Sequence, residues 1–180
     1  MRINKEEALF LLIDIQERLY PVMHNREELL QKSRILLQGM DVLGVPGIVT
    51  EQYPRGLGST LEELKELLPA GDTIEKLSFS CCGEPSFFLE LERSGRKRIL
   101  VFGIEAHVCV LQTVTDLTEA GFTPVVVSDC ISSRKEEDKL IALDRMKAEG
   151  ALLTTVESIL FELAGVAGTE EFKAISRLVK

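Results

Sequence analysis

Histidine is scarce in this chain, which contains only His24 and His107. Metal-dependent hydrolases build their sites from several histidines and carboxylates, and no aspartate is grouped near either histidine. Cysteine spacings typical of structural zinc, such as CxxC, are missing as well. We therefore expect neither a metal ion nor any other cofactor.

Positive charge is also in short supply. The chain has 21 Lys and Arg against 29 Asp and Glu, which gives a formal net charge of -8. Nucleic acids and anionic membranes require a clustered positive field, and the short basic run at residues 96–98 is read as a solvated loop. No apolar stretch approaches the roughly 20 residues that cross a bilayer, and the N-terminus does not resemble a signal peptide. We predict a cytoplasmic protein with no nucleic-acid or membrane partner.

Stretches rich in proline, glycine or serine, which mark interdomain linkers, do not occur. The composition, 45% hydrophobic and 28% charged, is that of a soluble globular chain. A single domain over residues 1–180 is therefore expected. Two of the four cysteines are adjacent, which does not suggest a spaced disulfide framework, so reduced thiols are predicted.

Short apolar segments alternate with segments of helical spacing along the whole chain. Strands are predicted at residues 8–13, 47–50, 73–76, 99–102, 125–129 and 151–154. Helices are predicted at residues 25–43, 61–68, 85–94, 106–120, 136–149, 156–163 and 170–179. Six strands alternating with helices demand crossover connections of one hand, which predicts an α/β three-layer sandwich with a parallel sheet.

Three reactive residues fall where parallel strands end, which is where open α/β sheets bind ligands. Asp14 ends the first strand, Lys76 ends the third, and Cys109 lies in the first turn after the fourth. A helix N-terminus and a cation would both lower the pKa of the Cys109 thiol, while Asp14 could take and return its proton. His107 is two residues from Cys109 and would point to a different helix face. His24 is as readily a surface or oligomer contact as a catalytic group.

Each of the three has an ordinary structural alternative. A lone cysteine such as Cys109 is often an inert small hydrophobe, and an aspartate after a strand, such as Asp14, often forms a turn or a helix cap. Lys76 alone would be read as a solvated surface charge. Only their combination indicates a catalytic site.

Three segments together resemble the isochorismatase-like cysteine hydrolases: residues 11–16 (LLIDIQ), residues 75–79 (EKLSF) and residues 103–110 (GIEAHVCV). The resemblance runs from about residue 7 to the C-terminal helix. It implies the strand order 3-2-1-4-5-6, with Asp14, Lys76 and Cys109 as catalytic triad. It also implies a cis peptide between Ile104 and Glu105.

The same resemblance implies an oxyanion hole formed by the backbone N–H groups of Glu105 and Cys109. Substrate-facing side chains are less defined: the candidates lie near strand ends, and each could equally serve packing or turn structure. They are Gln16, Gln52, Tyr53, Phe79 and Ala106.

Nicotinamidases of this superfamily carry metal-binding Asp and His residues after the second strand, whereas this chain has TEQYP at residues 50–54. A nicotinamidase is therefore disfavoured, and the chain resembles the branch whose substrates are mostly undefined. The function expected is hydrolysis of a small amide or, less favoured, of a vinyl ether.

Two other functions remain open. One is a non-catalytic oligomeric scaffold, with Phe161, Leu163 and Phe172 of the terminal helices at a subunit interface. The other is a redox-responsive protein in which Cys81, Cys82 and Cys109 exchange, although buried inert thiols are the simpler reading of the adjacent pair. Self-association into a homo-oligomer is expected in every case.

Overall fold

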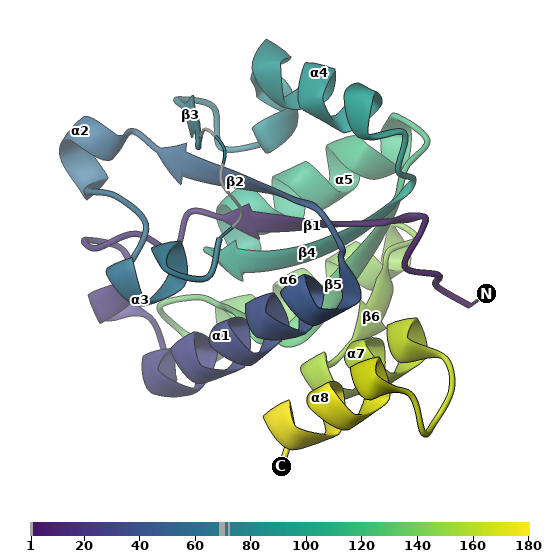
Figure 1. The fold of residues 1–180 in the computed structure, drawn as a ribbon. Helices are drawn as coiled ribbons and strands as arrows, with labels where there is room; N and C mark the ends of the chain where they lie inside the picture. The colour runs from purple at the N-terminus through teal and green to yellow at the C-terminus, as the bar shows by residue number, and fades with distance from the viewer. Residues whose placement is uncertain (1, 69–70, 72) are drawn as a thin grey trace.

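A six-stranded parallel sheet forms the centre of the molecule (Figure 1). The computed structural model describes residues 2–68, 71 and 73–180. The strands are β1 (Ala8–Ile13), β2 (Gly47–Gln52), β3 (Ile74–Lys76), β4 (Arg98–Ile104), β5 (Thr123–Ser132) and β6 (Leu152–Thr154). Their order, β3-β2-β1-β4-β5-β6, confirms the predicted topology, and the order reverses between β1 and β4.

Helices cover both faces of the sheet (Figure 1). One face carries α1 (Arg26–Leu43), α7 (Val156–Ala164) and α8 (Glu170–Leu178), which pack on one another. The other carries α4 (Pro85–Ser94), α5 (Leu111–Glu119) and α6 (Glu136–Ala148). Shorter turns in the connections are η1 (Tyr20–Val22), α2 (Pro54–Leu57), α3 (Glu62–Lys65), η2 (Cys81–Gly83) and η3 (Ala106–Val110).

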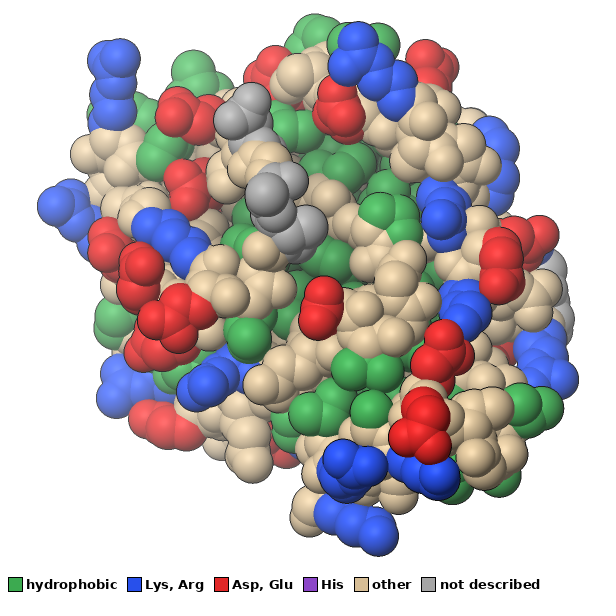
Figure 2. All heavy atoms as spheres, viewed as in Figure 1, with side chains coloured by type: hydrophobic (Ala, Val, Ile, Leu, Met, Phe, Trp, Pro, Cys, Tyr) green, Lys and Arg blue, Asp and Glu red, His purple; other side chains and the backbone are tan. Residues whose placement is uncertain are grey.

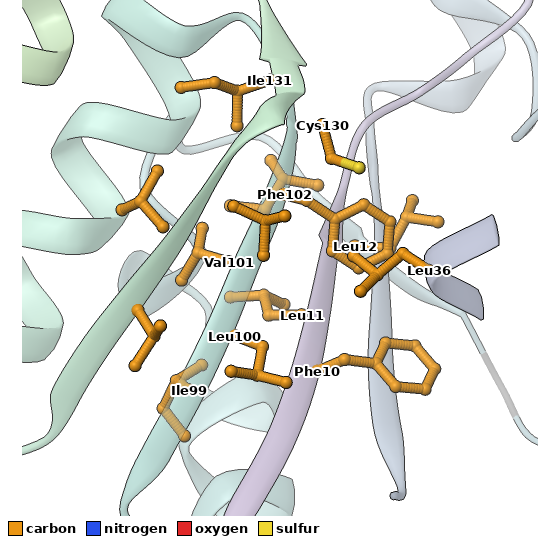
Figure 3. Close-up of a cluster of buried hydrophobic side chains, with 14 of the residues drawn as sticks. Phe10, Leu11, Leu12, Leu36, Ile99, Leu100, Val101, Phe102, Cys130 and Ile131 are labelled. Carbon is orange, nitrogen blue, oxygen red and sulfur yellow. The ribbon is translucent and has the colours of Figure 1, made fainter. Parts of the chain in front are cut away.

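The central strands are buried on both faces, as their uninterrupted apolar runs predict. Every residue of β1 is buried, and side chains from β1, β4 and β5 pack together with Leu36 of α1 (Figure 3). The rings of Phe10 and Phe102 lie 6.1 Å apart on neighbouring strands. Close packing of this kind holds the ends of β1 and β4 in fixed positions, which matters because reactive residues follow both ends.

β5 is longer than predicted and reaches Ser132 instead of ending at residue 129. Val101 of β4 pairs with Val126, whereas Gly103 pairs with Ile131, so the register shifts between the two contacts. The polar residues that mark a strand end in the sequence fall within this shifted stretch. Pairing then resumes and carries the chain to Ser132 beside Ile104.

The predicted helix at residues 106–120 begins with a wider turn, η3, before α5 starts at Leu111. The N–H of Val110 donates to the carbonyl of Glu105, five residues back, at 3.2 Å. Such π-type turns occur mostly as single insertions and often at functional sites.

The terminal helices pack their apolar side chains against each other within the chain. The rings of Phe161 and Phe172 lie 5.8 Å apart within the chain, and Leu163 is only 5% exposed. The apolar sides of α7 and α8 pack on each other and on α1, which buries Leu163 and leaves Phe161 and Phe172 half-buried. A subunit interface at these residues stays a prediction.

Acidic and basic side chains are interspersed over the face of the molecule that Figure 2 shows. Among the helices of the described residues, none is both long and apolar enough to span a bilayer.

Candidate active site

Asp14 directly follows β1 and lies in the switch between β1 and β4. Its backbone has a φ of 53°, in the left-handed region, and its side chain is fully buried. Thr50 Oγ1 donates to Asp14 Oδ1 at 2.8 Å, and Lys76 Nζ lies 2.7 Å from Asp14 Oδ2. Both carboxylate oxygens therefore have a polar partner.

Lys76 ends β3 and points its ammonium into the protein. Its side chain has no exposed surface, and Nζ donates to Gln52 Oε1 at 2.7 Å and to the carbonyl of Phe79 at 2.9 Å. With the carboxylate of Asp14, these acceptors surround the buried cation. A charge of this kind is tolerated in an interior only when it is paired and hydrogen-bonded.

Cys109 lies in η3 and is 5% exposed. Its thiol interacts with the carboxylate of Asp14, which contributes to its raised pKa, and its carbonyl accepts a bond from Thr113 Oγ1 at 2.7 Å. The structure thus brings together the three residues that the sequence singled out. They come from segments far apart in the chain.

The turn that carries Cys109 begins with a cis peptide between Ile104 and Glu105. The carbonyl of Glu105 accepts hydrogen bonds from the N–H groups of Val108 and Val110, at 3.0 and 3.2 Å. The N–H of Cys109 lies between these two donors and does not bind that carbonyl.

The electrostatics differ from the expectation that Lys76 would hold the resting sulfur as an anion. Burial, reinforced by the charge on Asp14, raises the pKa of the Cys109 thiol, and the opposing effect of Lys76 is too small to reverse this. The resting thiol is therefore protonated.

Burial also raises the pKa of Asp14, although Lys76, Thr50 and the thiol oppose the shift. Burial alone would lower the pKa of Lys76, but the charge of Asp14, with smaller contributions from Cys109 and Cys81, outweighs it and raises that pKa. Asp14 is consequently a stronger base than an exposed aspartate, and Lys76 keeps its charge.

Two of the expected pocket residues hold the framework instead of facing a cavity. Gln16 is fully buried and its amide donates to the carbonyls of Gln52 and Gly58 at 3.0 and 2.7 Å. Gln52 donates to the carbonyl of Leu77 at 2.8 Å and accepts from Lys76. Gln52 therefore positions the buried amine.

The other three expected pocket residues differ in how far they are exposed. Tyr53 and Phe79 are 51% and 54% exposed, and Tyr53 lines a cleft of about 480 Å³ together with Lys76, Leu77 and Glu84. Ala106 is fully buried in η3. Of the five expected pocket residues, only Tyr53 and Phe79 thus present their side chains to solvent.

Sequence reasoning missed Thr50, although it lies near the end of β2 and so shares the edge where Asp14 and Lys76 were found. It also left open the role of Cys81, which is fully buried with its sulfur 3.8 Å from Thr50 Oγ1. Burial raises the pKa of Cys81 to about 11. Within the described part of the chain, no group of three or more His, Cys, Asp or Glu residues is arranged to hold a metal.

Fold and site together define a three-layer α/β protein with a thiol, a carboxylate and an amine at the switch point of its sheet. The chain belongs to the isochorismatase family, whose domain matches residues 8–158, and members of this family are generally hydrolases.

Three relatives illustrate the likeness. Isochorismatase domain-containing protein 1 of Salmo salar is 39% identical over 173 residues, which cover 96% of this chain but only 61% of that protein. A structure described as MAR1 ribonuclease from Caenorhabditis elegans is 38% identical, with a TM-score of 0.93 over 99% of this chain and 92% of that chain. YcaC from Pseudomonas aeruginosa, with hexane-2,5-diol and covalent acrylamide, is 26% identical, with a TM-score of 0.91 over 97% of this chain and 89% of its own.

Proposed function

We propose that this protein hydrolyses a small amide, with Cys109 as nucleophile, Asp14 as general base and acid, and Lys76 as the charge that holds Asp14. The observation that carries the proposal is the burial of all three groups together, in which the carboxylate of Asp14 pairs with the amine and interacts with the thiol. A structural role alone does not call for burying an ion pair against a thiol, because burying charge is costly.

In the first half of the reaction, Asp14 takes the thiol proton as the sulfur bonds to the carbonyl carbon. The π electrons of the carbonyl move to its oxygen, and the N–H groups of Glu105 and Cys109 stabilise that oxyanion. The C–N bond then breaks, and Asp14 gives its proton to the departing amine, which leaves a thioester on Cys109.

In the second half, Asp14 removes a proton from a water molecule while the oxygen of that water bonds to the thioester carbon. The C–S bond breaks, the sulfur recovers the proton, and a carboxylic acid departs. Lys76 remains protonated throughout, since its raised pKa keeps it charged beside the four acceptors that surround it.

The covalent acrylamide in the P. aeruginosa YcaC structure supports the proposal, since a covalent adduct requires a nucleophile in that protein. The 5% exposure of Cys109 further favours a compact substrate over a polymer.

The decisive measurement compares wild type with Cys109→Ala across panels of small amides, esters and carbamoyl compounds. We expect turnover by wild type, an acyl-enzyme detectable by intact mass, and loss of both in Cys109→Ala. Cys82→Ala is the matched control, because it removes a neighbouring, half-buried thiol and should retain turnover. Equal turnover by wild type and Cys109→Ala would refute the proposal, and no turnover by either would favour the scaffold.

An RNA substrate belongs in the same panel because one relative is described as a ribonuclease. The formal charge of -8 argues against it, since phosphate backbones bind positive fields. RNA cleavage lost in Cys109→Ala would replace the amide by a phosphodiester as the substrate.

We also propose that the chain forms a homo-oligomer. Three large apolar side chains beside the site, Tyr53, Leu77 and Phe79, are more than half exposed, and their burial is the expected driving force. Light scattering coupled to size exclusion tests this, and a monomer at micromolar concentration would contradict it.

A further inference from the structure

Two side chains that follow β5 contact the turn at residues 105–109, here called the oxyanion turn. Arg134 Nε and Nη2 donate to the two carboxylate oxygens of Glu105 at 3.1 and 2.9 Å. Ser133 Oγ lies 2.9 Å from Nδ1 of His107. The arginine side chain is 63% exposed while the Glu105 side chain is 9% exposed, so an external side chain reaches in to a buried carboxylate.

The segment that carries these side chains is itself held firmly. The N–H of His24 donates to the carbonyl of Ser133 at 2.9 Å, and Ser132 Oγ donates to the carbonyl of His24 at 2.6 Å. Ser132 also pairs with Ile104 at the end of the sheet. Residues 132–134 are thus fixed both to the strand that precedes the oxyanion turn and to the loop before α1.

The Glu105 side chain does not serve its own helix, since it makes no capping bond to η3. Its two oxygens are directed to Arg134, and its carbonyl accepts from Val108 and Val110. Because the side chain and the carbonyl of Glu105 are both bound, rotation about the backbone bonds of this residue would break several hydrogen bonds. Fixed backbone donors are what an oxyanion hole needs, since they stabilise charge without reorganising during the reaction.

We infer that Arg134 and Ser133 are positioning residues that hold the oxyanion turn, and with it the backbone N–H groups of Glu105 and Cys109, in reactive geometry. The inference rests on the proposed function, in which those N–H groups stabilise the oxyanion. It adds the residues after β5 to a site otherwise built from β1, β2, β3 and η3. The pairing of Ser132 with Ile104, after the β4–β5 register shift, places these residues beside the turn.

Two small probes separate the oxyanion hole from the nucleophile. Acetaldehyde adds reversibly to a thiol: the sulfur bonds to the carbonyl carbon, and the proton passes through Asp14 to the carbonyl oxygen, which occupies the oxyanion position. With iodoacetamide, the sulfur instead bonds to the methylene carbon as Asp14 takes the thiol proton, iodide leaves to solvent, and no oxyanion forms. Positioning of the turn should therefore affect the first reaction much more than the second.

For Arg134→Ala we expect acetaldehyde to bind about tenfold more weakly and kcat to fall about 100-fold, as for small displacements of catalytic groups, with KM changed less than about threefold. Alkylation of Cys109 should stay within about twofold of wild type, since nucleophilicity depends on the thiolate and its access. Arg134→Lys keeps the positive charge but cannot make the paired hydrogen bonds to Glu105. Its acetaldehyde affinity and its kcat should therefore lie between those of wild type and Arg134→Ala. Glu105→Gln should resemble Arg134→Ala.

Arg145→Ala is the matched control, because Arg145 is 61% exposed and also faces a glutamate, Glu149. It should leave both probes and turnover unchanged. If Arg134→Ala binds acetaldehyde as wild type does, or loses alkylation to the same extent, the positioning role is overturned. Wild type that alkylates at Cys109 but binds no acetaldehyde overturns this inference alone, whereas an unreactive Cys109 overturns the proposed function as well.

Discussion

Asp14 Oδ2 lies 2.7 Å from Lys76 Nζ, and neither side chain has any exposed surface. Two charges buried in this way have lost their hydration, so each depends on the other for compensation. The thiol of Cys109 shares the same carboxylate, which makes the ion pair part of the chemistry as well as of the fold.

Lys76→Met should lower the free energy of unfolding by about 3 to 5 kcal/mol, because it leaves a buried carboxylate without its cation. Urea denaturation measures this. Lys173→Met is the control: Lys173 also lies 2.7 Å from a carboxylate, that of Glu170, but on the surface, and should cost less than about 1 kcal/mol. Equal losses in the two variants would show that the buried pair is not coupled as described.

The pH dependence of kcat/KM should have an acidic limb set by Asp14. The base works only as a carboxylate, and burial raises its pKa above the ordinary 3.8, so activity should be lost at a higher pH than for an exposed aspartate. The pKa of Lys76 is raised above 10.5, so the amine should cause no alkaline loss below that value. An acidic limb at or below 3.8 would contradict the role of Asp14.

Thr50→Val should move that limb further up, since the hydroxyl of Thr50 stabilises the charged form of Asp14. Thr50→Val should also lower the free energy of unfolding by about 1 to 3 kcal/mol, as expected for a buried acceptor left without its donor. Thr118→Val is the control, because its hydroxyl bonds only a helix carbonyl, that of Val114. A pH profile that Thr50→Val leaves unmoved would argue against Asp14 as the titrating base.

The remaining thiols should be inert in the folded protein. Burial raises the pKa of Cys81 to about 11 and that of Cys82 to about 12, so few molecules carry a thiolate at neutral pH. The side chains that bond to these two thiols are hydroxyls, whereas Cys109 interacts with the carboxylate of Asp14, which can take its proton. Mass spectrometry after mild peroxide should find both reduced in native protein and oxidised in urea. A native disulfide or sulfenic acid at either position would revive the redox-responsive reading.

Gly103→Ala should destabilise the protein by at least about 3 kcal/mol, since a methyl group there would collide with the backbone carbonyl of Ile13 and no rotamer relieves it. Gly121→Ala is the control, with a φ of 81° and open space around it, and should cost about 1 to 2 kcal/mol from backbone conformation alone. Thermal or urea unfolding distinguishes the two. A Gly103→Ala variant no worse than the control would mean that the strands separate more easily than their packing indicates.

The strands and their alternation with helices could be predicted because continuous apolar runs such as residues 8–13 have one stable environment, the interior of a parallel sheet. The end of β5 could not, because its pairing resumes after a register shift that depends on β4, not on local sequence. The wide turn η3 was missed for a similar reason: residues 106–120 have ordinary helical spacing, and the departure lies in the backbone bonds to Glu105.

The reactive groups of the candidate site could be predicted from the sequence. The residues that hydrogen-bond to them and hold them in place could not. Asp14, Lys76 and Cys109 stand out as reactive types at strand ends, whereas the glutamines at 16 and 52 look like pocket residues until their bonds are seen. The protonated state of Cys109 was also beyond the sequence, since it depends on how deeply the thiol is buried.

All the reactive groups lie along one rim of the sheet. The opposite rim is closed by unrelated contacts, such as the Lys97 ammonium 4.5 Å from the centre of the Phe122 ring and the N–H of Arg98 bonded to the carbonyl of Glu7. Substitutions that raise thermal stability can therefore occur at the far rim, while substitutions that change the substrate occur at the rim with the reactive groups. The two demands meet only in the strands that join the rims.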